Sequence, residues 1–438
     1  MSEHVSHRIG PIHLAPEVLP RHAWTFLLVA FFSIGLMTFI GVGQTYVLNA
    51  HLGVPQEQQG VISSYLIFLT EVVTLLLFLP AGILIDRIGR RSIYALGFVF
   101  LGLTYVLYPL AQSVNELYFY RVIYGLGVVA VAGALSTVLV DYPAEHSRGK
   151  LVAIIGVLSG LGIVVINQGF GMLPEVLTDA GYSGIAAGRI THFVITALCI
   201  MIAGIVMLGL RPGIPIQRKD RPSARELFRG GFAAARNPRI ALAYSAAFIA
   251  RGDQSVNALF LILWGTHAGQ ALGMETAEAV KHGTMIFVIT QLSALVWAPI
   301  LGPVLDRIDR VTALAICMVL AAIGNIAPLL LADPLSDYGL IFFILLGIGQ
   351  ISVFLSAQSL IGQEAPEKQR GSILGAFNVS GAIGIMLITL AGGYLYDAVD
   401  PRAPFVVVGI VNILLFVASA LVRWHQGPQL SVPKQPRL

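Results

Sequence analysis

Four charged side chains lie deep inside apolar stretches of the sequence, namely Glu71, Arg121, Arg251 and Asp253. An ionisable group at the centre of a bilayer costs at least about 2.5–3.5 kcal/mol on insertion scales, so such residues usually face a protein interior and have a function. A carboxyl group there can take up and release protons, and an arginine can hold a carboxylate or phosphate through two parallel hydrogen bonds. We therefore expect proton coupling or substrate binding at these four positions.

Glu71 shares a helical side with Ser64 and Thr74, which lie seven residues before it and three after it. This polar stripe predicts that Glu71 points inward, as a proton carrier requires. The alternative is a structural carboxyl group that is hydrogen-bonded to a neighbouring helix or paired with a cation such as Arg121.

Arg251 and Asp253 are separated only by Gly252 and lie about twelve residues into their apolar stretch, near the bilayer midplane. Residues two positions apart do not share a helical face. We expect Gly252 to loosen the helix so that both charges turn inward, as in the broken helices of transporter sites. The alternative is an ion pair that holds this helix to a neighbour.

Uncharged polar residues in other apolar stretches are further candidates for contact with a substrate. Each of them can equally act as a hydrogen-bonding contact between helices. They are Gln44, Asn167, Gln168, Gln291, Gln350 and Asn378.

The elements that position these residues follow from the composition of the chain. Of its 438 residues 56% are hydrophobic and only 11% are charged, whereas soluble domains carry about 25% charged residues. Apolar stretches of roughly 20 residues, enough to cross the hydrocarbon core as a helix, recur along the chain. We predict an all-α membrane protein with twelve spans near 24–48, 58–81, 92–111, 116–140, 151–172, 190–210, 239–264, 283–303, 312–331, 339–361, 371–394 and 404–422.

The basic residues predict the orientation of these spans. With both termini in the cytoplasm, the cytoplasmic segments hold 22 of the 27 lysines and arginines and the external loops only three. Such an asymmetry is what the positive-inside rule expects. The 20-residue polar leader lacks a cleavage pattern, so we interpret the first stretch as a retained span, and a bacterial inner membrane fits the short loops.

The longest cytoplasmic segment divides the chain into nearly equal halves. We predict an N-terminal six-helix half with its leader over 1–210, a linker over 211–238, a C-terminal half over 239–425 and a tail over 426–438. Within the linker, Ser223 and Glu226 have the spacing of a helix capping box, which predicts a short amphipathic helix on the membrane surface.

An internal repeat supports two pseudo-symmetric six-helix bundles. The segment Gly82-x3-Asp86-Arg87-Ile88-x-Arg90 reappears 220 residues later, at Gly302, Asp306, Arg307, Ile308 and Arg310. Duplicated halves are how many secondary transporters build a site near the midplane and rock around it. A channel, a receptor or a membrane enzyme does not require such a repeat.

The loop Gly82-x3-Asp86-Arg87-x-Gly89-Arg90-Arg91 resembles the signature loop of the major facilitator superfamily, and the partial copy at 302–310 and the six-plus-six layout extend this resemblance over nearly the whole chain. The resemblance implies that the loop helps to close the cytoplasmic side. The gating residues would be Gly82, Asp86, Arg87, Gly89, Arg90, Asp306, Arg307 and Arg310. The alternative is that the arginines only anchor the topology.

Two further segments resemble patterns of the same family. Arg121-x3-Gly125-x-Gly127 is similar to a pattern whose arginine is often tied to proton coupling. The glycines of the stretch from Gly156 to Gly171 resemble the glycine-rich span of drug/proton antiporters.

The sequence therefore predicts a secondary active transporter rather than an enzyme, with the lipid bilayer, protons and a small organic solute as its partners. We expect proton-coupled export of an amphipathic compound through Glu71 or Asp253. The alternative is a proton-coupled uptake symporter for an organic anion held by Arg121 and Arg251. A non-transporting receptor or lipid-handling protein is the remote alternative. We expect a monomer and assign no cofactor, no metal and no nucleic acid, since neither a nucleotide motif nor metal-ligand spacing is present.

Overall fold

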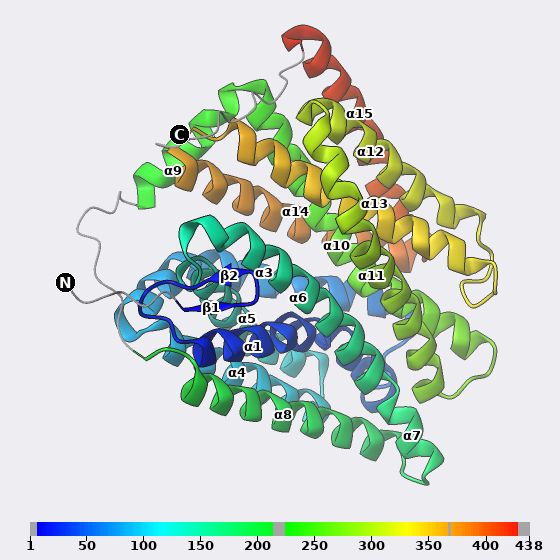
Figure 1. The fold of residues 1–438 in the computed structure, drawn as a ribbon. Coiled ribbons are helices and arrows are strands. Elements are labelled where there is room, and N and C mark those ends of the chain that lie inside the picture. The colour runs from blue at the N-terminus through cyan, green and yellow to red at the C-terminus, as the bar shows by residue number, and fades with distance from the viewer. Residues whose placement is uncertain (1–6, 213–223, 367–368, 428–438) are drawn as a thin grey trace. The chain divides into compact units, whose positions relative to one another are not determined.

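A computed structural model describes residues 7–212, 224–366 and 369–427, without the side chains of Leu79, Asp86 and 224–228. The described part is almost entirely helical (Figure 1). Its helices before residue 212 are α1 Pro20–Thr38, α2 Ile40–Tyr46, the π-helix η1 Val47–His51, α3 Gln56–Ile88, α4 Arg90–Leu107, η2 Tyr108–Leu110, α5 Val114–Asp141, η3 Glu145–Ser147, α6 Arg148–Gly171, α7 Leu173–Asp179 and α8 Gly184–Gly209. The later ones are α9 Ala224–Ala233, η4 Ala234–Arg236, α10 Pro238–Ala271, α11 Thr276–Arg307, α12 Arg310–Ile326, η5 Ala327–Leu330, α13 Gly339–Glu364, α14 Arg370–Ala398 and α15 Ala403–Gln426.

Each of the twelve predicted spans falls on one long helix or on a run of consecutive helices. Among the described residues, eleven of these are long and apolar enough to cross a membrane. The remaining one is α10, whose 34 residues give a length of about 51 Å. Its hydropathy is lowered in the middle by Arg251, Asp253, Gln254 and Asn257. The polar residues that are candidates for proton or substrate binding therefore also lower the hydropathy of α10.

Large apolar side chains cover the outer surfaces of these helices. Leu208 is 90% exposed and Leu330 79% exposed, values that would be unfavourable in water but fit contact with lipid. The chain is an integral, multi-pass membrane protein.

Contacts group the chain into two units. Unit 1 comprises Met1–Arg221 and Leu261–Gln291, and unit 2 comprises Pro222–Phe260 and Leu292–Leu438. In unit 1, α4 packs against α5 and α8, and α1 packs against α6; in unit 2, α12 packs against α13 and α15. In this grouping the 261–291 segment joins unit 1. The predicted division at the linker stays a prediction.

Glycine contacts repeat between the two halves of the sequence. A Cβ on Gly162 of α6 would lie 1.7 Å from the Phe31 carbonyl oxygen of α1, and a Cβ on Gly384 of α14 would lie 1.9 Å from that of Phe248 of α10. Only glycine permits such backbone contact between helices. The packing therefore supports the internal repeat that the sequence predicts.

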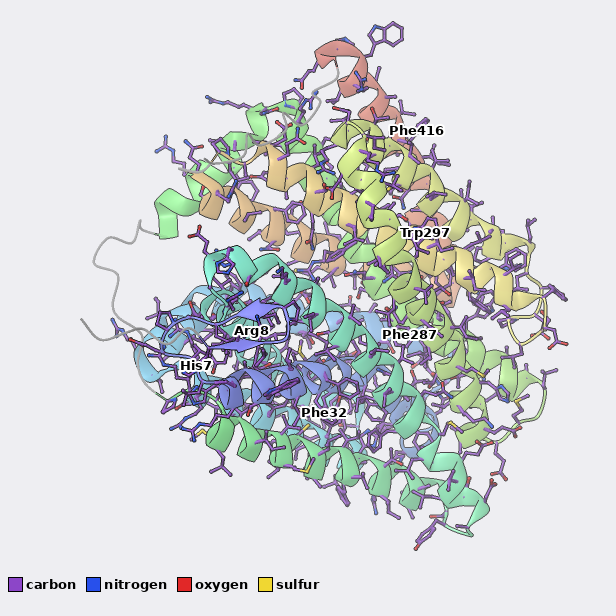
Figure 2. All side chains as sticks on the ribbon, viewed as in Figure 1. His7, Arg8, Phe32, Phe287, Trp297 and Phe416 are labelled. Carbon is purple, nitrogen blue, oxygen red and sulfur yellow. The ribbon has the colours of Figure 1, made fainter. Side chains whose placement is uncertain are left out.

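The leader forms a structure that the sequence did not predict. Strands β1 (Arg8–Ile9) and β2 (Ile12–His13) make a small antiparallel hairpin, and Arg8 is labelled on it in Figure 2. The hairpin docks on the segment between α5 and α6, where the Ala144 amide donates to the His13 carbonyl oxygen at 2.8 Å and the His13 amide donates to Ser147 Oγ at 3.1 Å.

The predicted linker helix is present as α9, Ala224–Ala233. Ser223, the predicted cap, lies outside the described residues, as does the Glu226 side chain. The helix packs against α14, and the Tyr244 hydroxyl of α10 donates to its Gly231 carbonyl oxygen at 2.8 Å.

Candidate functional site

The Asp253 carboxylate lies in the middle of α10, only 1% exposed. Its Oδ1 accepts a hydrogen bond from Asn257 Nδ2 at 3.0 Å, one turn further along the same helix, and its Oδ2 accepts one from Asn325 Nδ2 of α12 at 3.3 Å. Asn257 also donates to Gln350 Oε1 of α13 at 2.9 Å. The described residues include no ion pair to Asp253, so a buried carboxylate is surrounded by neutral amides.

Arg251 extends toward other neighbours. Its guanidinium carbon lies 5.9 Å from the centre of the Phe354 ring of α13, within cation–π range, and its Cγ packs beside Gly381 of α14. Arg251 and Asp253 thus have different neighbours, and the alternative of an ion pair that holds this helix to a neighbour stays a prediction.

The predicted loosening of α10 at Gly252 is wrong. The helix is continuous from Pro238 to Ala271, and a Cβ at Gly252 would lie 2.9 Å from Ile388 and 3.2 Å from the Gly384 carbonyl oxygen of α14. The glycine permits close helix packing instead, and the two charges leave the helix on different sides because they are two positions apart.

Arg121 of α5 is 4% exposed and is bound by neutral groups. Its Nε donates to Thr70 Oγ1 at 2.9 Å and to the Leu66 carbonyl oxygen at 3.2 Å, and its Nη1 donates to the Tyr108 hydroxyl at 3.3 Å. The guanidinium also lies 4.6 Å from the centre of the Tyr124 ring. Arg121 thus links α5 to α3 and to η2.

Glu71 lies half-buried on α3, directly after Thr70. The described residues include no ion pair between it and Arg121, whose guanidinium contacts are those given above. The glycines that follow Arg121 pack as predicted, because a Cβ on Gly125 would lie 2.9 Å from Val73 of α3, and one on Gly127 would lie 2.9 Å from Leu101 of α4.

The predicted amide residues fall into two groups. Gln44, Asn167 and Gln350 are buried, and Asn167 joins α6 to α1 by donating to Thr38 Oγ1 at 2.8 Å. Gln168 and Gln291 are half-buried and Asn378 is exposed. Both polar atoms of Gln44 lack a hydrogen-bond partner among the described residues, which makes Gln44 the least satisfied of the group.

Three polar residues near these sites were missed by the sequence analysis. Asn257 was recognisable from its spacing of four residues after Asp253, but Asn325 lies 72 residues away and only the fold brings it close. His192 of α8 is 1% exposed, and its Nδ1 lies 2.8 Å from the Gly188 carbonyl oxygen.

The signature loop is a tight connection between α3 and α4. Gly89 has φ 105°, which favours glycine, and Arg90 pairs with Asp141 of α5. Arg87 and Gly82 are exposed, and the Asp86 side chain lies outside the described residues.

The second copy of this loop differs in its chemistry. Asp309 stands where the first copy has Gly89, and it caps α12 by accepting from the Thr312 amide at 3.0 Å. Arg310 pairs with Asp306 at 2.8 Å, while Arg307 is exposed. Asp309 also lies 3.8 Å from the buried Arg239 of α10. Arg239 in turn lies 3.4 Å from Glu364 of α13, so the copy is held within unit 2.

A polar cluster in unit 1 connects α10 to the N-terminal helices. Asn49 of η1 and Gln59 of α3 exchange two hydrogen bonds of 3.0 Å. His267 Nε2 of α10 lies 3.1 Å from Gln59 Oε1, and Gln270 Nε2 donates to Asn49 Oδ1 at 3.2 Å. We call these four residues the Asn49 cluster. Most of the basic residues lie near one end of the spans, and the Asn49 cluster lies near the other end.

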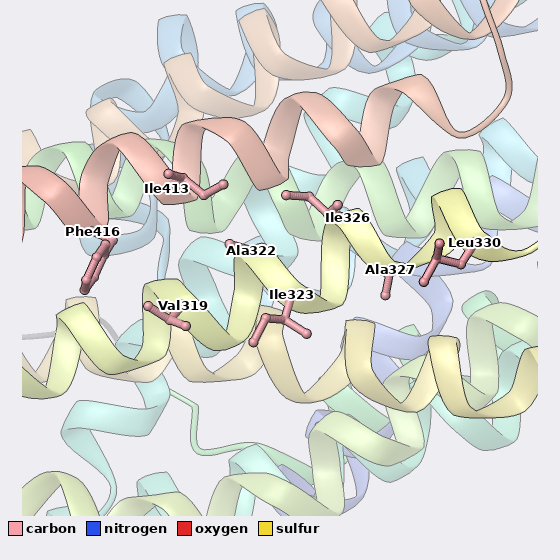
Figure 3. A pocket seen from close by; sticks show the side chains of 8 residues that line it. All are labelled: Val319, Ala322, Ile323, Ile326, Ala327, Leu330, Ile413 and Phe416. Atoms are coloured by element: carbon pink, nitrogen blue, oxygen red, sulfur yellow. The ribbon is translucent and has the colours of Figure 1, made fainter.

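The apolar groove between α12 and α15 is not a plausible substrate site. It has a volume of about 460 Å³ and lies within unit 2 (Figure 3). Its lining is entirely apolar, with no group that could orient a polar solute. The lining residues are Val319, Ala322, Ile323, Ile326, Ala327, Leu330, Ile413 and Phe416.

A polar contact also joins α11 to α13. Trp297 of α11 (Figure 2) donates its Nε1 to Ser352 Oγ of α13 at 3.0 Å.

A multi-pass helical fold with repeated packing and buried charges at mid-helix is typical of secondary membrane transporters. The sequence matches the Major Facilitator Superfamily over residues 25–280 and again over 243–437. The chain belongs to this family, as its signature loop predicts, and it is a transporter rather than an enzyme.

Several relatives cover most of the chain. The magnetosome protein MamH of Paramagnetospirillum magneticum is 27% identical over 92% of this chain and 92% of its own length. MamZ of the same organism is 26% identical over 91% of this chain but only 62% of its own length. Multidrug resistance protein 2 of Bacillus subtilis is 21% identical over 89% of this chain and 91% of its own length.

Solved structures agree on the fold. The nucleoside transporter NupG has a TM-score of 0.71 at 14% identity, over 92% of this chain and 99% of its own. A bacterial homologue of the lysosomal transporter Spinster, in an inward-facing and unoccupied conformation, has a TM-score of 0.67 at 14% identity, over 95% of this chain and all of its own.

Proposed function

We propose that this protein is a proton-coupled antiporter that exports a small amphipathic compound by alternating access, with both termini in the cytoplasm of a bacterial cell. The observation that carries the proposal is the buried Asp253 carboxylate, which has amide partners but no cation among the described residues. An ionised group in such surroundings is costly unless its charge is compensated. Proton binding compensates it directly.

The direction of transport is supported by two sequence likenesses. The α6 glycines resemble the drug/proton antiporter pattern, and several relatives carry multidrug resistance names. The magnetosome names do not state a substrate. Export of an amphipathic compound is the function that these relatives favour.

Alternating access is supported by the Asn49 cluster. It joins α10 to the N-terminal helices through hydrogen bonds, each worth only about 0.5–1.5 kcal/mol net. Contacts of this strength can form and break during a transport cycle, whereas an interlocked apolar interface resists separation. In the proposed orientation the cluster lies at the external side.

Uptake of an organic anion is the second candidate, and Arg251 favours it. Arg251 is half-buried and lies on the same helix as the coupling carboxyl group, near the middle of the span. Arg121 would have to exchange its bonds to Thr70, Tyr108 and the Leu66 carbonyl oxygen before it could hold an anion.

The test uses proteoliposomes that contain the purified protein and a luminal pH dye, with no initial gradient. Organic cations, anions and neutral amphiphiles are added outside. Luminal alkalinisation supports antiport, because protons leave the lumen as the compound enters. Luminal acidification would mean symport and would overturn the proposed antiport. Under the proposal Asp253→Asn abolishes the response, while the matched control Asp337→Asn, which removes an exposed loop carboxylate, leaves it intact. An unchanged response in Asp253→Asn and a lost one in Glu71→Gln would move coupling to Glu71.

A further inference from the structure

The two asparagines that bind Asp253 are only half satisfied. Asn257 and Asn325 are both fully buried, and each donates its Nδ2 to one carboxylate oxygen. The Oδ1 atoms of both have no hydrogen-bond partner among the described residues. An orphaned buried acceptor costs about 1–3 kcal/mol, and two of them sit beside the same carboxylate. This arrangement calls for a ligand that uses the oxygens.

A proton alone does not explain so many amides. One carboxyl group suffices to carry a proton, yet the side chains of Asn257, Asn325 and Gln350 converge here from three different helices. Half a turn about the terminal torsion exchanges the nitrogen and oxygen of a carboxamide. After that rotation, the carboxylate and amide oxygens form the kind of ligand set that hard cations prefer.

The charge balance selects a monovalent ion. The described residues place no arginine, lysine or histidine in an ion pair with Asp253, and Arg251 extends toward Phe354 and Gly381 instead. A single positive charge neutralises the carboxylate, whereas a divalent ion would leave an excess charge in a buried place at high cost.

We propose that Asp253, Asn257 and Asn325 form a binding site for Na⁺, in which the carboxylate and the two Oδ1 atoms hold the ion. The inference rests on the coupling role proposed above for Asp253 and extends it to a second ion. The Na⁺ site and the proposed antiport can be tested separately, because the test of the site measures ion binding in the absence of substrate and transport.

The test is equilibrium binding of radioactive Na⁺ to the purified full chain in lipid nanodiscs, with choline replacing Na⁺ to keep ionic strength constant. We expect saturable binding of one ion per chain. Asp253→Asn, which preserves shape, should abolish it. Asn257→Ala and Asn325→Ala should each raise the dissociation constant by about tenfold, which corresponds to the loss of roughly 1.4 kcal/mol.

The matched control is Asn412→Ala. Asn412 of α15 is also buried with an orphaned Oδ1, but its amide donates to Val408 of its own helix at 2.9 Å. Its variant should bind Na⁺ within twofold of the parent, by rough expectation for a residue that is not a ligand. Elution volume and helical content establish that each variant is folded.

Three results would overturn the site. The first is no saturable Na⁺ binding by the unaltered chain. The second is binding that persists in Asp253→Asn. The third is loss in Asp253→Asn with no change in either asparagine variant, which would mean that the amides are structural and that the carboxyl group acts alone.

Discussion

At the scale of single residues, the four charges inside the spans have unequal surroundings. Arg121 is held by hydroxyl and carbonyl oxygens and a tyrosine ring, so its positive charge is fixed in place. Asp253 is held only by amide nitrogens, so its charge is the one that ligand or proton binding changes most readily. This difference is why we assign coupling to Asp253.

A pH effect belongs to a residue outside the spans. Asp400, between α14 and α15, accepts hydrogen bonds of 2.8 Å on both carboxylate oxygens from Arg402, and these hold the pKa of Asp400 below its usual range. A lowered folded-state pKa stabilises the protein above the ordinary carboxyl range, and this contribution disappears as pH falls through the folded-state value.

Asp400→Asn should therefore lower the thermal unfolding midpoint at pH 7 and have a smaller effect at an acid pH below the lowered folded-state pKa of Asp400. The loss should stay below about 1 kcal/mol because the pair is partly exposed to solvent. Thermal unfolding at both pH values, with Asp337→Asn as control, measures it. An equal loss at both pH values would mean that the effect is not electrostatic.

At the scale of elements, close helix contacts depend on single glycines. Gly384 of α14 and Gly162 of α6 meet main-chain carbonyl oxygens of α10 and α1, respectively. The same kind of contact therefore fixes α10, which carries Asp253, and α1, which lies directly before the short helix that carries Gln44. The two halves of the sequence therefore repeat a helix-packing contact as well as a sequence motif.

Gly384→Ala should separate α14 from α10 and lower the free energy of unfolding by about 1–3 kcal/mol, as other overpacking substitutions do. Gly375→Ala on the same helix is the matched control, because a Cβ there meets nothing within 4 Å. The control should be neutral or slightly stabilising, since alanine favours helix more than glycine does. Thermal unfolding of both variants in detergent measures the difference, and equal midpoints would refute the packing argument.

At the scale of the whole molecule, the segment 261–291 belongs with the N-terminal helices although it follows them by some fifty residues in the sequence. The Asn49 cluster and the 2.6 Å ion pair between Lys281 and Glu175 hold it there. Under the proposed cycle, these contacts must break before the site can open to the external side.

His267→Ala should favour the externally open state. The expected readout is faster labelling of Gln44→Cys by a membrane-impermeant maleimide, by roughly two- to tenfold for the loss of one hydrogen bond. Both native cysteines are buried and give little background. His282→Ala on α11 is the control and should leave the rate unchanged. Slower or unchanged labelling in His267→Ala would argue against a gating role for the cluster.

The sequence by itself determined that this is a membrane protein, where its twelve spans lie, that it has an internal repeat and to which family it belongs. These follow from local composition and spacing, because lipid requires continuous apolar helices whose backbone groups bond internally. It also identified Arg121 and Asp253 as buried charges, because charge is rare inside spans. Arg251 is half-buried. Glu71 proved half-buried, and its role remains a prediction.

Only the tertiary structure decided which groups meet. It showed that Gly252 packs against α14 instead of breaking α10, that Arg251 and Asp253 turn to different neighbours, and that Asn325 joins Asp253 from another helix. No metal was assigned from the sequence because ligand spacing was sought along the chain. Oxygen atoms from separate helices can form a cation site only after the helices pack, since their separation in sequence carries no information about their distance in space.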